Sequence, residues 1–80
     1  MTLRLEIANS FANDVFTKFG LGVTVLSSRD EVFEISVKVR VNSELFAWLF
    51  KNAKYVRIIS PQRVIDDYKD SLLLALDNLK

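Results

Sequence analysis

The chain has 80 residues, half of them hydrophobic, and a formal net charge of only +1. A chain of this length is expected to form one domain over residues 1–80. It contains no Cys and no His, which excludes thiolate catalysis, histidine acid–base catalysis and zinc sites that need these ligands. The lack of Cys favours a cytoplasmic protein without disulfides. No run approaches the ~20 apolar residues that a membrane span needs.

The first half of the sequence predicts a strand, a helix and a hairpin. Residues 2–8 alternate between apolar and polar, as in a strand with one buried face. Residues 9–10 are good helix caps, and an amphipathic helix follows them as far as Gly20, where it is expected to end. Residues 23–26 and 32–41 are β-prone and flank a turn, so they predict a β-hairpin.

The second half predicts a helix, a strand and a long final helix. Asn42 is the expected cap of the first of these helices, with Glu44 in its first turn. Residues 55–59 predict a strand. Ser60–Pro61 predicts the start of the last helix, with Ser as the cap and Pro at the first helical position. The order β-α-β-β-α-β-α predicts an α+β fold, a ferredoxin-like β-α-β-β-α-β sandwich with an appended C-terminal helix.

The aromatic side chains of the first two helices are expected to fill the core. They are Phe11, Phe16, Phe19, Phe46 and Phe50. Trp48 lies at the edge of the apolar arc of its helix. It is therefore expected to be partly exposed and to contact a neighbouring domain.

The last helix is rich in leucine. At about 100° per residue, seven of its apolar residues fall within one arc of about 120°, which is a normal core-facing stripe. They are Val64, Ile65, Tyr68, Leu72, Ala75, Leu76 and Leu79. Leu73 falls just outside this arc and Leu74 nearly opposite it. Because exposed apolar clusters usually mark contact sites, Trp48, Leu73 and Leu74 form the candidate partner interface, for a second copy or another domain.

A basic character is expected on the face of the sheet that the helices leave open. The residues concerned are Arg4, Lys38, Arg40 and Arg57. They predict a surface for an anion or single-stranded nucleic acid. The alternative is an ordinary polar face, since Glu6 and Glu34 dilute the positive charge. No aromatic residue is expected on its central strands, which argues against an RNA-recognition sheet.

One carboxylate cluster, Asp66, Asp67 and Asp70, lies in the last helix. It could hold a metal ion, but its spacing does not resemble a calcium loop, and a solvated helix face is the favoured interpretation. The sequence also lacks a glycine-rich phosphate loop. We therefore assign no catalytic residue, no cofactor and no metal, and we expect a protein that is not an enzyme.

Several segments together resemble a known pattern. They are residues 33–39 (FEISVKV), 43–50 (SELFAWLF) and 56–61 (VRIISP), followed by a helix with Tyr68 and Ala75-Leu76. This pattern is similar to the C-terminal extension of WYL-domain transcription regulators of bacteria. The opening strand and helix fit the start of the same module. One departure is that residues 51–54 are Lys-Asn-Ala-Lys, where the family often has a Gly after the Trp-bearing helix.

The resemblance implies a parent chain in which a helix-turn-helix and a WYL domain precede this extension. In that family the WYL domain senses a ligand, in some members a nucleic acid, and the extension helps to form the dimer and to relay sensing. The expected function is thus a non-catalytic regulatory module that acts in dimerisation and effector coupling. Residues of the WYL pocket have no matching positions in this chain.

Overall fold

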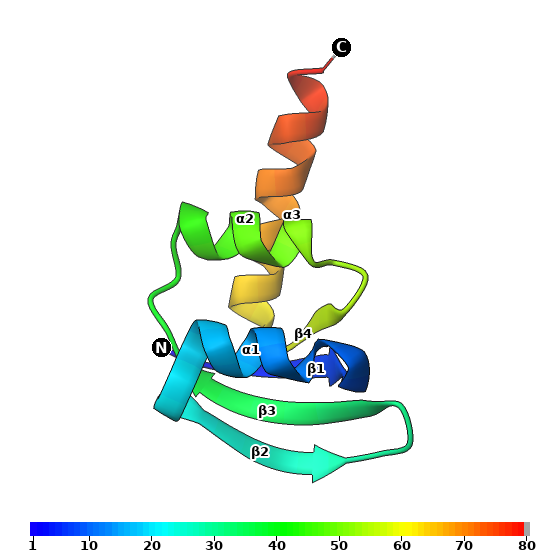
Figure 1. Cartoon of the computed structure of the whole chain (residues 1–80). Coiled ribbons are helices and arrows are strands. Elements are labelled where there is room, and N and C mark those ends of the chain that lie inside the picture. The colour runs from blue at the N-terminus through cyan, green and yellow to red at the C-terminus, as the bar shows by residue number, and fades with distance from the viewer. Residues whose placement is uncertain (80) are drawn as a thin grey trace.

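A four-stranded antiparallel sheet in the order β2-β3-β1-β4 forms the framework of the chain (Figure 1). The computed structural model describes residues 1–79, with Leu21 described by its backbone alone. The elements are β1 (Thr2–Ala8), α1 (Ala12–Phe19), β2 (Val23–Ser28), β3 (Val32–Lys38), α2 (Ser43–Lys51), β4 (Val56–Ser60) and α3 (Gln62–Asp77).

The α+β class is confirmed, but the chain as a whole does not have a standard ferredoxin topology. A third helix, α3, follows β4 and has 16 residues, against 8 in α1 and 9 in α2. Short 3-10 turns at Asn9–Phe11 and Gly20–Gly22 also flank α1. The supported description is therefore a four-stranded antiparallel sheet with three helices, one of them C-terminal.

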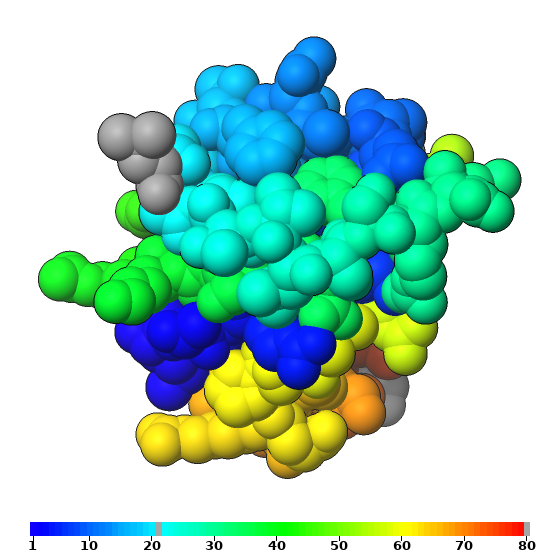
Figure 2. Space-filling model, turned by 90° about the horizontal axis from the view of Figure 1, so that it is seen from below, coloured from blue at the N-terminus to red at the C-terminus, as the bar shows by residue number. Residues whose placement is uncertain are grey.

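The core lies between one face of the sheet and the helices. Central strand β1 pairs with β3 on one side and β4 on the other, and its side chains Leu3, Leu5 and Ile7 are fully buried. They share one cluster with Val15 of α1 and Leu49 of α2. The alternating residues of the strands point to the opposite face. Figure 2 shows the four strands side by side, from β2 (cyan) to β4 (yellow).

Two of the predicted helix boundaries are confirmed and two are wrong. Asn42 caps α2, because its Oδ1 accepts a hydrogen bond of 2.9 Å from the backbone N–H of Leu45. Gly20 ends α1 with a φ of 59°, a conformation that favours glycine. Asn9 does not cap α1. Its side chain donates to the carbonyl of Asp30 and so ties the start of the helical segment to the β2–β3 turn.

The start of α3 also differs from the prediction. Ser60 is the last residue of β4, and Pro61 is the N-cap residue without a side-chain hydrogen bond. Ser60 pairs with Arg4 of β1 in the sheet, so its backbone is used by the ladder. The helix therefore begins one residue later than the sequence predicted.

Strand lengths follow the available pairing partners. The predicted strand 32–41 ends at Lys38, because Lys38 pairs with Thr2, the first residue of β1. Strand β2 runs to Ser28, beyond the predicted strand end at residue 26, since Ser28 still pairs with Phe33. Tyr55 lies in the turn before β4 rather than in the strand.

The role of Leu49 in joining α2 to the sheet can be measured. Leu49 is 2% exposed, so Leu49→Ala leaves a cavity and is expected to lower the free energy of unfolding by about 2–4 kcal/mol. Leu74→Ala, at a position exposed to solvent, is the control and is expected to change it by less than about 0.5 kcal/mol. Urea unfolding followed by circular dichroism measures both, and equal losses would contradict the placement of Leu49.

Candidate functional site

The C-terminal half of α3 extends beyond the rest of the molecule. Its first turn packs on the body, where Val64 is buried and α3 lies against β4. Its last turns project away from the sheet and from α2, as Figure 1 shows in orange and red. Three leucines of this half are exposed to solvent, Leu73 (59%), Leu74 (64%) and Leu76 (58%), as is Leu79 (82%) in the turn after the helix.

The prediction that seven apolar residues of this helix form a core-facing stripe is therefore wrong for its second half. Val64 is buried and Tyr68 is half-buried, but Leu76 and Leu79 are exposed although they lie on the same side of the helix. A helix of 16 residues is about 24 Å long. The last described contact between aromatic rings of α2 and α3 is that of Phe46 with Tyr68, at 5.5 Å. Beyond this level the described body offers little that could cover the stripe.

An apolar groove of about 460 Å³ lies between α2 and the projecting part of α3. Its walls are Phe46, Ala47 and Phe50 from α2, with Tyr68, Ser71, Leu72, Ala75, Leu76 and Leu79 from α3 or the turn after it. Ser71 and Tyr68 bring the only polar side-chain groups to this lining. We call this feature the α2–α3 groove, and it is the candidate functional site.

Phe50 and Phe16 are not core residues, contrary to the prediction. Phe50 is 64% exposed and lines the α2–α3 groove, whereas Phe16 is 41% exposed and its ring lies near that of Phe33. On α2, Leu45 and Leu49 fill the side that faces the sheet, which turns Phe50 away from it by about 120°. The prediction, which was based on hydrophobicity alone, therefore placed these two rings wrongly in the core.

Trp48 occupies the other flank of α2. Its ring lies 5.1 Å from that of Phe19 and 6.0 Å from that of Phe11, and the Phe11 ring stacks on Tyr55 at 5.1 Å. Trp48 is half-buried, in line with the expected partial exposure. It joins α1 to α2 and, like Leu73 and Leu74, does not line the α2–α3 groove.

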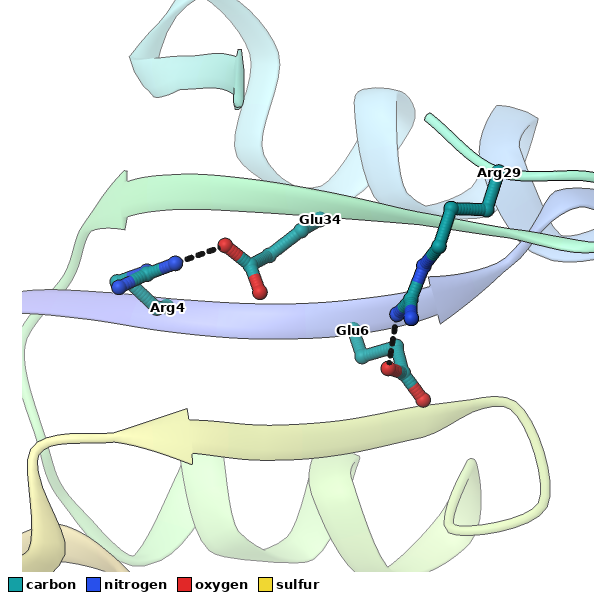
Figure 3. Close-up of polar contacts among 4 residues, drawn as sticks. All are labelled: Arg4, Glu6, Arg29 and Glu34. Carbon is teal, nitrogen blue, oxygen red and sulfur yellow. Dashed lines mark hydrogen bonds and ion pairs between the residues drawn. The ribbon is translucent and has the colours of Figure 1, made fainter. Parts of the chain in front are cut away.

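The basic face predicted on the sheet is partly neutralised by acids (Figure 3). Arg4 forms an ion pair with Glu34 of the neighbouring strand β3. Glu6 accepts a hydrogen bond of 2.8 Å from Arg29 of the β2–β3 turn. In the register of the sheet, Arg57 lies opposite Glu6. Acids and bases are thus mixed on this face, where Glu6 and Glu34 are also partners in the register of β1 and β3.

The structure does not bring all four predicted basic residues together. Arg4, Lys38 and Arg57 belong to strands of the sheet, but Arg40 follows the end of β3. It lines a separate hollow of about 500 Å³ with Arg63 and Asp67 of α3. Arg63 could not be predicted from the sequence. Strand β3 ends at Lys38, so the segment with Arg40 leaves the sheet and lies beside Arg63 at the start of α3.

Residues 1–79 contain neither a cluster of metal ligands nor a membrane-spanning helix. Within that range, no group of three acidic side chains lies close enough to hold a metal ion, including Asp66, Asp67 and Asp70. None of the helices described there is both long and apolar enough to cross a membrane. The α2–α3 groove remains the feature to explain.

Comparisons with known proteins add no family: no protein-family model and no curated protein matches the sequence. The groove and its flanking leucines are therefore interpreted from their own chemistry. A groove with apolar walls and few polar groups binds apolar side chains of a ligand or protein partner.

Burial of Tyr68 in the groove wall has a measurable consequence. Desolvation raises the pKa of Tyr68 above its usual value of 10.0. The absorbance of the Tyr68 phenolate is the difference between the wild type and the Tyr68→Phe variant. We expect this difference to titrate with a midpoint above pH 10. Because desolvation disfavours the phenolate only in the folded state, the free energy of unfolding is unaffected below pH 10 and falls as the pH rises from there through the folded-state pKa.

The chain has a second tyrosine, Tyr55, so the difference between wild type and Tyr68→Phe isolates the phenol of interest. Circular dichroism at each pH checks that the protein stays folded. A difference titration centred at or below pH 10 in folded protein would contradict the burial of Tyr68.

Proposed function

We propose that this chain is a non-catalytic regulatory module of a bacterial transcription regulator, which acts in dimerisation and effector coupling. The observation that carries the proposal is the α2–α3 groove with the exposed leucines beside it. An apolar surface of this kind is costly to leave in water and is typical of contact sites.

The chemistry of the groove favours association over catalysis. Apart from the hydroxyl groups of Ser71 and Tyr68, its lining side chains are hydrocarbon. The chain has no His and no Cys, and the phenol of Tyr68, whose pKa is raised above 10.0 by desolvation, is neutral near pH 7. None of these groups is suited to act as a nucleophile or general base near pH 7.

The place of the module in a larger regulator is supported by the resemblance to the C-terminal extension of WYL-domain proteins. The strand order β2-β3-β1-β4, with α1 and α2 on one face, supports the finer proposal of a ferredoxin-like sandwich. In this proposal α3 is the appended helix that makes the contact. The upstream WYL domain of the parent chain is the second partner, through which an effector signal would reach the dimer.

Self-association is the part of this proposal that is tested directly. Wild-type protein is expected to form a dimer between about 1 and 100 μM, measured by light scattering at several concentrations. Leu73→Glu puts a charge beside the groove and is expected to raise the dissociation constant at least about tenfold, since a charge is costly to desolvate. A strict monomer at the top of this range, with an equally soluble Leu73→Glu variant, would contradict the proposal.

A second candidate function is the binding of an anion or single-stranded nucleic acid. The observation that favours it is the hollow lined by Arg40, Arg63 and Asp67, because the two arginines outnumber the one carboxylate and guanidinium groups suit a phosphate. Lys38 and Arg57 on the sheet would extend such a surface. The ion pairs of Arg4 and of Glu6 weigh against it, since they leave the sheet face close to neutral.

This candidate predicts salt-sensitive binding of a fluorescent single-stranded oligonucleotide. Replacement of Lys38 and Arg40 by Ala removes two positive charges, so affinity at low salt and the salt dependence of binding are both expected to fall. Fluorescence anisotropy measures both quantities. The matched control replaces Lys51 and Lys69 on the helices, which removes the same charge elsewhere. Absence of wild-type binding at low salt would eliminate this function.

A further inference from the structure

The exposed leucines of α3 do not form one patch. With Val64 as reference and about 100° per residue, Leu76 lies at about 120° and Leu73 at about 180°. Leu74 lies at about 280°, on the other side of the polar face that carries Asp70. Leu76 and Leu79 line the α2–α3 groove, whereas Leu74 does not. Leu73 continues the groove side outward as a ridge, and Leu74 stands apart from it.

From this arrangement we infer that a second copy of the chain docks through its own α3, in antiparallel orientation, along the α2–α3 groove. The inference rests on the proposed function and names the partner and the surface. The leucines of each α3 enter the groove of the other copy. The two-fold axis passes near Leu76, which lies at the middle of the exposed groove-side leucines.

A symmetric dimer requires one surface that is complementary to itself. The end of α3 meets this requirement because it carries the ridge at Leu73 and also, with Leu76 and Leu79, one wall of the groove. Phe50 of α2 forms the opposite wall. In the dimer, the ridge of each copy therefore packs into the groove of the other copy.

The exposed apolar area agrees with what such a dimer needs. The exposed parts of Phe50, Leu73, Leu76 and Leu79 amount to on the order of 500 Å² in each copy. A standard interface buries about 800 Å² per partner, of which roughly 60% is apolar. The groove side of α3, without Leu74, thus supplies the apolar part of one standard interface.

The groove-side leucines Leu73 and Leu76 lie in a run of α3 without charged residues. Residues 71–76 (SLLLAL) are uncharged, and the nearest charged residues of α3 are Asp70 and Asp77 at the two ends of this run. Desolvation of an unpaired charge would oppose association. Leu76 is the last residue of this run, so a contact centred on it includes the run on one side of the axis, and Asp77, which follows, lies about 100° around the helix from Leu76.

Site-specific crosslinking tests the arrangement, because the chain has no Cys of its own. A single Leu76→Cys change places thiols of both copies next to the axis. A short bifunctional maleimide is expected to convert most of this variant to a covalent dimer. The matched variant Leu74→Cys is expected to give little covalent dimer, because its thiols face away from the contact.

A second crosslinking measurement tests entry into the groove. Phe50→Cys and Leu79→Cys, made as separate variants and then mixed, are expected to give a linked heterodimer in higher yield than either variant alone. In solution, Leu76→Glu is expected to weaken the dimer at least about 30-fold, as for a central interface residue. Leu74→Glu is expected to weaken it less than about threefold. Circular dichroism confirms that each variant is folded.

Three outcomes would overturn the inference. If the wild type is a dimer but the Leu74→Cys variant crosslinks better than the Leu76→Cys variant, the interface lies elsewhere. The proposed dimerisation then still stands. Equal effects of Leu74→Glu and Leu76→Glu on the dissociation constant do the same. A monomer at every concentration in light scattering removes the proposed dimerisation together with this interface, and the groove then belongs to another occupant.

Discussion

Burial of one face of β1 is the interaction on which the rest of the structure depends. Strand β1 lies inside the sheet with a partner on each side, and Leu3, Leu5 and Ile7 are inaccessible to solvent. Helices α1 and α2 add Val15 and Leu49 to the same cluster. Removal of this face from water supplies the main driving force for folding in so small a domain. It also defines which face of every other element points inward.

The size of this core sets a limit that α3 exceeds. The first turn of α3 is anchored in the core by Val64. The helix then continues beyond the contact between the rings of Phe46 and Tyr68. Its later leucines, Leu73, Leu74 and Leu76, keep the helical period but are exposed to solvent. The α2–α3 groove is thus a direct result of attaching a 16-residue helix to a sheet of short strands. Self-association would bury this surface at no cost to the core itself.

The charged residues on the open face of the sheet are largely paired with one another. On the open face, Arg4 and Glu34 are neighbours across two strands, and Glu6 is reached by Arg29 from the hairpin turn. Pairs exposed to solvent in this way add little stability. They do, however, reduce the positive potential that the sequence implied for this face. Arg40 lies outside this arrangement, at the hollow it shares with Arg63.

Much of the fold could be predicted from local patterns. Alternation defined β1, Asn42 marked the start of α2, and Gly20 marked the end of α1, since these signals depend on the backbone and on immediate neighbours. The end of β3 could not be predicted, because it depends on where the partner strand begins. The cap at Asn9 failed because its side chain bonds instead to Asp30, 21 positions away.

For the candidate site, the sequence by itself determined that the last helix carries more leucine than a core needs, and it singled out Leu73 and Leu74. Only the tertiary structure decided that Phe50, Leu76 and Leu79 belong to the exposed surface and that Leu74 stands apart from the groove. The physical reason is that periodicity states which residues share a side of a helix. It does not state how far along the helix that side stays covered, which depends on the length of the helix relative to the body it packs against.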